Sequence, residues 1–288
     1  MNKRVILYCV TALCLLLGMS SCGNGTTSDK QKTFNASRSE QASTSSAKNI
    51  FFYTRQHRAD KYSPTEEKLG FGSQIKSINP NEFKDNKNIR EVWVAPQIQH
   101  IAEGAFAGCT SLEKLHFQGT VAVINDDAFN GCTALKDLYV DAYTIGLDAF
   151  FECKSLETVR FGEHIWWIRD GAFAYCPKLR SVLMGITMEK LEFGAFEGSK
   201  NIEEFSIPND FKNSMFGHVP SAPKWKKIYL LSTEYYHMPK NCTPNKDCTL
   251  YVPDAFLDKF RADADWMKFG SIEPLSKSRY YTAEGFWK

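Results

Sequence analysis

The stretch Ala105-Phe106-Ala107-Gly108-Cys109-Thr110-Ser111-Leu112-Glu113-Lys114-Leu115-His116-Phe117 returns along the chain in recognisable copies. The best copies keep an alanine-phenylalanine pair, a cysteine three residues after the phenylalanine, and a leucine three residues after the cysteine. The phenylalanines are spaced 23, 23, 21, 23, 23 and 20 residues apart, at Phe83, Phe106, Phe129, Phe150, Phe173, Phe196 and Phe216. A fixed period in this range is typical of stacked units that are each too small to bury their own apolar face. The sequence therefore predicts a repeat protein whose core forms between neighbouring units.

Each copy also carries aliphatic residues at fixed places before its alanine. The residue four places before is Ile101, Ile124, Ile145, Ile168 or Leu191, and three places earlier stand Ile98, Val121, Ala142, Ile165 and Met188. The alternating residues after the leucine predict a short strand, which would pair in parallel with its copies about 4.8 Å away. The Ala-Phe-x-x-Cys segment predicts a helical turn. We expect an α/β repeat solenoid of about seven coils of 20 to 23 residues, with a parallel sheet on one face and short helical turns on the other.

The repeated phrase resembles the BspA-like leucine-rich repeat family of bacterial surface proteins, over Ile75 to Leu230. The stretch from Cys248 to Ile272 resembles the closing unit of that family, a strand, a helix begun after proline, and a last strand. The resemblance implies a leucine-rich repeat fold, surface display, and binding or adhesion, and it fixes no ligand. We expect an N-terminal capping segment over residues 49–74, repeats over 75–231 and a C-terminal cap over 232–288.

The N-terminus predicts export. Lys3 and Arg4 precede an apolar run from Val5 to Met19, which is typical of a secretory signal and short for a membrane span. Small residues directly before Cys22 resemble the lipobox of bacterial lipoproteins, in which the cysteine becomes the acylated N-terminus. The resemblance implies a signal peptide over residues 1–21 and a lipid anchor at Cys22 in the outer membrane, on either of its faces. Residues 22–48 are polar and predict a disordered tether.

Charge argues against a nucleic-acid partner. Loss of Lys3 and Arg4 with the signal would reduce the 35 basic residues to 33, equal to the 33 acidic ones. Nucleic-acid binding depends on a surplus of Lys and Arg that releases counterions from phosphates, and the sequence has neither that surplus nor a basic run.

Four cysteines occupy one repeat position: Cys109, Cys132, Cys153 and Cys176. Ser199 stands at the same position of the next copy, so we expect small, reduced core side chains there rather than disulfides. Zinc ligands converge on one point, whereas these thiols would lie one coil apart along a line, so no metal is predicted. Cys242 and Cys248 are the one candidate disulfide. The sequence lacks the common enzyme motifs, and we predict neither catalysis nor a cofactor.

The candidate binding residues are those whose side chains the repeat pattern directs outward. The outward residue of four successive predicted strands is Trp93, His116, Tyr139 and Arg160. Such a row could stack on a sugar or form an aromatic and arginine hot spot for a protein. It could equally be cross-strand pairing that stabilises the sheet, and the sequence leaves both open.

Trp166 and Trp167 stand between the inward Ile165 and Ile168, at positions that the repeat pattern leaves exposed. Exposed apolar patches often mark contact surfaces, so we expect at least one of the two to contact a partner unless a neighbouring loop covers it. The predicted function is a surface or envelope module that binds or adheres to a protein or glycan. The alternative is a structural or assembly component of the cell envelope that binds a partner in its own membrane.

Overall fold

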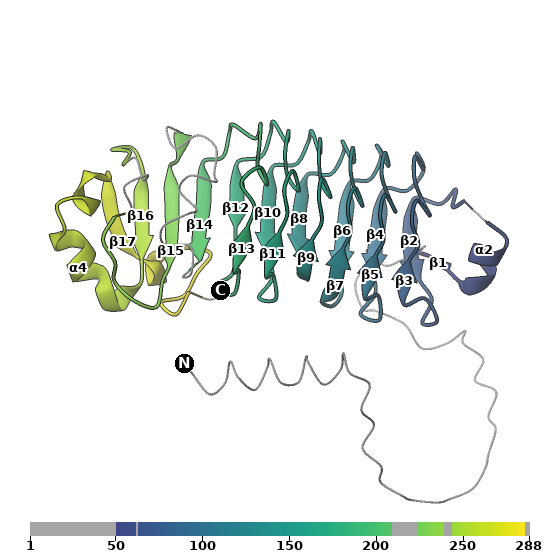
Figure 1. The fold of residues 1–288 in the computed structure, drawn as a ribbon, viewed down its shortest axis with the longest axis horizontal. Helices are drawn as coiled ribbons and strands as arrows, with labels where there is room; N and C mark the ends of the chain where they lie inside the picture. The colour runs from purple at the N-terminus through teal and green to yellow at the C-terminus, as the bar shows by residue number, and fades with distance from the viewer. Residues whose placement is uncertain (1–49, 62, 209–223, 239–243, 286–288) are drawn as a thin grey trace, which may run out of the picture. The chain divides into compact units, whose positions relative to one another are not determined.

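A computed structural model describes residues 50–61, 63–208, 224–238 and 244–285, which belong to one compact unit, Lys48–Lys288 (Figure 1). The predicted signal peptide and tether, with Cys22, lie outside the described residues, and so does Cys242. The unit is a parallel β-solenoid of about eight turns, which confirms the predicted repeat fold.

The strands predicted after each leucine form the larger face of the solenoid (Figure 1). A 4-stranded sheet has the order β1-β2-β4-β6, and a 7-stranded sheet has the order β17-β16-β15-β14-β12-β10-β8. Their strands are β1 Phe51–Tyr53, β2 Lys68–Phe71, β4 Glu91–Val94, β6 Lys114–Phe117, β8 Asp137–Val140, β10 Thr158–Phe161, β12 Ser181–Leu183, β14 Glu204–Pro208, β15 Lys227–Leu231, β16 Thr249–Val252 and β17 Ser271–Pro274. All pairings are parallel, and each residue pairs with the residue at the equivalent position of the neighbouring repeat. The ladder is interrupted between β6 and β8.

The aliphatic positions before each alanine form a second parallel sheet, which the sequence analysis did not predict as strands. Its six strands are β3 Ser77–Ile78, β5 His100–Ile101, β7 Val121–Ile124, β9 Ala142–Ile145, β11 Trp167–Ile168 and β13 Lys190–Leu191. Stacking at one face of a coil brings the backbone of the opposite face into the same spacing. The buried N–H and C=O groups there are then satisfied by pairing with the next coil.

The Ala-Phe-x-x-Cys segments are hydrogen-bonded turns and not the helical turns expected from the sequence. The backbone N–H of Phe106 donates to Ala128 O, and that of Phe150 donates to Ala172 O, both at 2.8 Å. The amides that alternate with these bond locally, three residues back, as the N–H of Ala107 does to Gly104 O at 2.9 Å. Because every second amide bonds to the next coil, the segment forms separate turns and no continuous helix. In the described residues, helices occur at the ends of the stack: α2 Arg55–Ala59, η3 Asp254–Phe256, α4 Leu257–Ala262, η4 Trp266–Lys268 and η5 Leu275–Lys277.

A column of phenylalanine rings runs through the core. Phe106, Phe129, Phe150 and Phe173 are fully buried, and their neighbouring ring centroids lie 5.2, 5.0 and 5.1 Å apart with nearly parallel planes. The column continues to Phe83 and Phe196 with stacked rings. Offset stacking of this kind contributes about 0.5–1.5 kcal/mol per pair beyond the burial of the rings.

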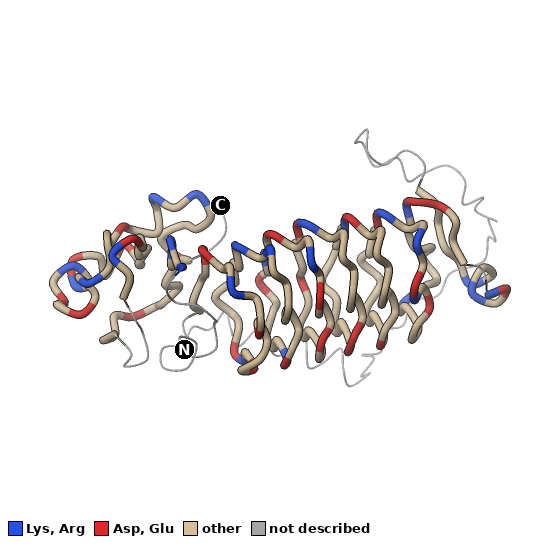
Figure 2. Tube along the Cα trace, turned by 90° about the horizontal axis from the view of Figure 1, so that it is seen from above, with Lys and Arg blue, Asp and Glu red and all other residues tan. Residues whose placement is uncertain are grey.

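Charges alternate along one edge of the coils, at the residue before each of the eight strands from β2 to β15 on the larger face (Figure 2). In chain order these residues are Glu67, Arg90, Glu113, Lys136, Glu157, Arg180, Glu203 and Lys226. Arg90 Nη1 lies 2.7 Å from Glu113 Oε1, and Lys226 Nζ lies 3.0 Å from Glu203 Oε2. Exposed ion pairs stabilise a fold by only about 0–1 kcal/mol each. The alternation therefore acts mainly on specificity, because a coil displaced by one repeat would set like charges side by side.

The C-terminal segment, residues 275–285, turns back over the outer face of the larger sheet. Tyr281 is fully buried there against Leu183, Tyr229, Leu231 and Leu275, and its hydroxyl donates to Met184 O at 2.9 Å. Burial raises the pKa of the Tyr281 phenol well above its usual value, so it stays a hydrogen-bond donor.

Candidate functional site

The structure places the four predicted outward residues in one lane but in two pairs. Trp93 of β4 is in register with His116 of β6, and Tyr139 of β8 is in register with Arg160 of β10. The interruption of the ladder between β6 and β8 separates the pairs. We call these four residues the outward row.

Trp93 and His116 form a stacked pair. Their ring centroids are 4.5 Å apart with planes at 18°, and both side chains are half-buried. His116 Nε2 is buried and lies 3.7 Å from Glu91 Oε2, beyond hydrogen-bond distance. Burial lowers the pKa of His116, the effect of Glu91 being smaller, so the ring is neutral at neutral pH. Lys68 Nζ lies 5.9 Å from the centroid of the Trp93 ring, so the pair is a stack of two half-buried rings with a cation beside it.

Tyr139 and Arg160 project further. Tyr139 is 44% exposed, and Arg160 is exposed beside it. Burial of part of the Tyr139 ring raises the pKa of its phenol, and the charges of Asp141 and Glu163 raise it further. The phenol is thus a neutral hydrogen-bond donor at neutral pH.

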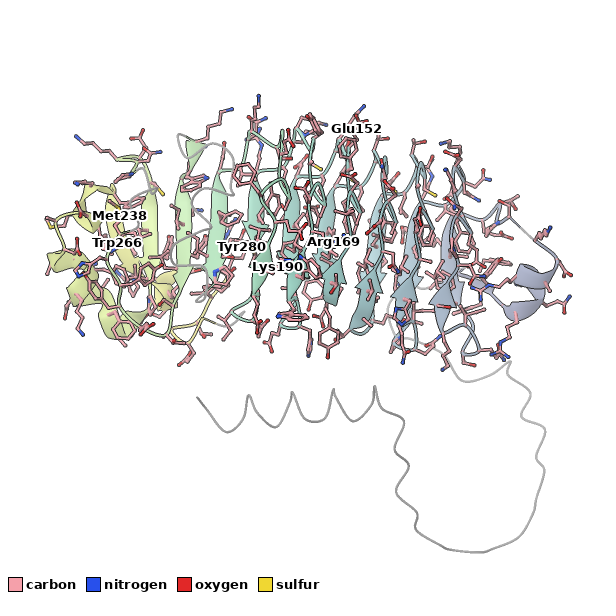
Figure 3. The ribbon with its side chains drawn as sticks, in the orientation of Figure 1. Glu152, Arg169, Lys190, Met238, Trp266 and Tyr280 are labelled. Atoms are coloured by element: carbon pink, nitrogen blue, oxygen red, sulfur yellow. The ribbon has the colours of Figure 1, made fainter. Side chains whose placement is uncertain are left out.

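Beyond Arg160 the same lane is closed by the chain itself. Leu183, Ser206 and Tyr229 occupy the equivalent outward positions of β12, β14 and β15, yet all three are buried. The C-terminal segment covers them through Leu275 and Tyr281, and the Tyr280 ring meets the Tyr229 ring edge-on. Tyr280 is labelled in Figure 3. The accessible part of the lane therefore comprises the outward row and, on the N-terminal side of Trp93, Phe52 of β1, which is 46% exposed and lies over Gly70 of β2.

The two predicted tryptophans have different surroundings. Trp166 is 51% exposed. Trp167 is half-buried, with Lys190 Nζ 3.9 Å and the Arg169 guanidinium 5.5 Å from its ring. Its Nε1 donates to Glu192 Oε1 at 3.0 Å. Lys190 and Arg169 are labelled in Figure 3. Cationic side chains of its own and the next coil, and not a loop, cover Trp167.

Among the described residues, four exposed aromatic side chains escaped the sequence analysis: Phe52, Tyr143, Tyr175 and Phe193. Tyr143 is 43% exposed and stands one coil before Trp166, whose N–H donates to Tyr143 O at 3.0 Å. Tyr175 is 48% exposed on the turn side of the solenoid. The signal that could have found Tyr143 is the alignment of the repeats, which puts it at the position of Trp166 in the neighbouring copy.

The four cysteines of the repeat position are buried free thiols. Each donates to a phenylalanine carbonyl of the preceding coil, from Cys109 to Phe83 O at 3.0 Å through Cys176 to Phe150 O at 3.4 Å. Ser199 repeats the contact to Phe173 O at 2.8 Å. Burial raises the pKa of the Cys109 thiol to about 12. Cys248 is buried as well, and the predicted pairing with Cys242 stays a prediction because Cys242 lies outside the described residues.

In the described part of the chain, no group of three or more His, Cys, Asp or Glu side chains is placed to hold a metal ion. None of the helices described is long and apolar enough to span a bilayer.

Residues 61–136 and 138–221 match the BspA type leucine-rich repeat region, in six copies. The chain belongs to this family of repeat proteins. No curated protein matches it.

Among solved structures, one similar chain is a leucine-rich repeat protein from T. pallidum, with 25% identity and a TM-score of 0.47, covering 62% of this chain and 77% of the other. A leucine-rich repeat protein from Bacteroides ovatus has 17% identity and a TM-score of 0.45, covering 73% and 68%. The pneumococcal vaccine antigen PcpA has 13% identity and a TM-score of 0.36, covering 74% and 79%.

Proposed function

We propose that this protein is an exported binding module, anchored through Cys22, that recognises a protein or glycan through the accessible part of its outer sheet face. The observation that carries the proposal is a difference in exposure along the outward lane, that is, along the equivalent outward positions of successive strands on the larger face. The C-terminal segment buries the apolar side chains of β12 to β15, whereas Trp93, His116, Tyr139 and Arg160 keep exposed surface.

Residue types support the same surface. Aromatic and arginine side chains dominate binding hot spots, because they bury much area with little loss of side-chain freedom. The Trp93–His116 pair is fixed by stacking before any ligand arrives, which lowers the entropic cost of binding. Proteins with such repeats typically bind partners and do not catalyse reactions.

The test is binding of the unit Lys48–Lys288, which holds the whole described core, to immobilised extracellular-matrix proteins and a glycan array. A Trp93→Ala, Tyr139→Ala double variant should lose the signal while circular dichroism shows that it is folded. Tyr175→Ala is the matched control, since it removes an aromatic side chain of similar exposure from the turn side.

Binding that survives the double variant would rule out the outward row as the recognition surface. If neither protein binds any external ligand, the envelope-assembly role is favoured, and cross-linking in the native membrane should then capture a membrane partner.

A further inference from the structure

One coil is two residues shorter than its neighbours, and the missing residues lie in a single turn. Phe129 and Phe150 are 21 residues apart, against 23 for the adjoining copies. Asp141 alone joins Val140 to Ala142, where the coil before has residues 118–120 and the coil after has residues 162–164. The flanking turns therefore extend past Asp141 on both sides.

The flanking turns meet above this short turn. Thr120 Oγ1 lies 3.2 Å from His164 Nδ1, although the two residues are 44 positions and two coils apart. Both contact the carboxylate between them: Thr120 Oγ1 donates to Asp141 Oδ2 at 2.7 Å, and His164 Nδ1 lies 2.9 Å from the same oxygen. The backbone N–H of His164 donates a further hydrogen bond to Asp141 Oδ1 at 3.2 Å.

The contacts fix the chemistry of His164. With Asp141 as an acceptor, Nδ1 carries the proton, and in the neutral ring Nε2 is then a hydrogen-bond acceptor. The His164 side chain is 46% exposed, whereas that of Asp141 is 13% exposed. The network thus offers a fixed, accessible imidazole on a largely covered carboxylate.

Gly162 makes this arrangement sterically possible. A Cβ on Gly162 would lie 2.3 Å from Asp141 Oδ1 and 2.7 Å from Asp141 Cβ. Both distances are far below van der Waals contact, and the second involves an atom that cannot rotate away.

Exposed aromatic rings flank the network. Tyr143 meets the His164 ring edge-on with centroids 5.8 Å apart, and Trp166 occupies the equivalent position one coil further. Tyr139 of β8 precedes Asp141 by two residues. Tyr139, Tyr143 and Trp166 are each between 43% and 51% exposed.

Aromatic faces beside fixed polar groups suit a saccharide, which has apolar C–H faces and a rim of hydroxyls that both donate and accept. The local charge disfavours an anionic one, because the network is built on the carboxylate of Asp141. We propose that Tyr143, Trp166 and the Thr120–Asp141–His164 network form a binding site for a neutral saccharide. The inference rests on the proposed binding function and names the ligand class of one part of the surface.

The test is native affinity electrophoresis of the unit Lys48–Lys288 in gels cast with mannan, dextran, galactomannan or xylan, and with the anionic polygalacturonate and hyaluronan. We expect at least one neutral polysaccharide to retard the protein. Trp166→Ala and Tyr143→Ala should each raise the dissociation constant about tenfold or more, as for hot-spot aromatics. Tyr175→Ala should leave it unchanged, and circular dichroism should show all three variants folded.

The proposal is overturned if no neutral gel retards the protein, if only the anionic gels do, or if Trp166→Ala and Tyr143→Ala migrate like the parent protein. Trp93-dependent binding to a matrix protein without any retardation by polysaccharide would overturn this inference and leave the proposed binding function standing.

Discussion

Replacing Phe150 by alanine removes one ring from the middle of the phenylalanine column. The ring is fully buried and stacks on Phe129 at 5.0 Å and on Phe173 at 5.1 Å. Phe→Ala changes in cores cost about 3–5 kcal/mol, because apolar contact is lost and a cavity remains. Small domains are stable by about 5–15 kcal/mol, so we expect this single change to remove a large part of the stability.

The position of the change adds a second effect. In a stack whose units contact only their neighbours, a weakened interface in the middle uncouples the two halves. We expect urea unfolding of Phe150→Ala, followed by circular dichroism at 25 °C, to become broader or to separate into two transitions. Hydrogen exchange should show the fastest opening in the coils that contact residue 150.

Two controls separate burial from stacking. Tyr175→Ala removes an exposed ring and should cost less than about 0.5 kcal/mol. A double-mutant cycle of Phe129→Ala and Phe150→Ala should give a coupling of about 0.5–1.5 kcal/mol. A loss below about 1 kcal/mol for Phe150→Ala would refute the role given to the column, and a coupling of zero would refute the stacking contribution.

Three further predictions concern the cysteines, His116 and the glycines of the turns. Because burial raises their pKa values, Cys109, Cys132, Cys153 and Cys176 should resist iodoacetamide at pH 8 in the folded protein, and mass spectrometry should find all four alkylated after unfolding without reductant; absence of label in the unfolded protein would mean disulfides. The pKa of His116 is lower in the folded protein than in the unfolded chain, so the unfolded chain takes up the proton first as the pH falls. The stability provided by the neutral ring is therefore present above about pH 6.5 and declines below it. An NMR titration of His116 with a midpoint at or above about 6.5 would contradict this. Gly171→Ala should lower the unfolding temperature more than Gly131→Ala. Both glycines have a positive φ, but only at Gly171 would the new Cβ meet a carboxylate oxygen, that of Asp148 at 1.9 Å. Equal decreases in the unfolding temperature would show that backbone strain alone matters.

Much of the fold could be predicted from the sequence because its information is repeated. The phenylalanine, cysteine and leucine positions recur in copy after copy, and their burial in the structure follows from that recurrence. The alternate outward and inward positions of the large-sheet strands were also predictable, since side chains alternate along a strand. The predicted helical turns are hydrogen-bonded turns in the structure, because every second amide, such as that of Phe106, bonds to the next coil, and a local pattern does not reveal that partner.

The candidate site was less predictable because exposure depends on contacts between distant residues. Leu183 and Tyr229 look as accessible as Tyr139 in the repeat alignment, and only the return of the C-terminal segment buries them. Trp166 and Trp167 are adjacent in the sequence, yet the cationic neighbours Arg169 and Lys190 cover the second.

The sequence by itself determined the repeat period, the residues that are buried in each coil, and which coil is two residues shorter than the others. Each of these follows from comparing one copy of the repeat with its neighbours. The tertiary structure alone decided which outward residues remain accessible. The Tyr281 hydroxyl reaches a carbonyl 97 positions earlier, and Thr120 meets His164 across the short coil. Stacking sets both distances, since it brings together side chains from coils whose sequences carry no mark of each other.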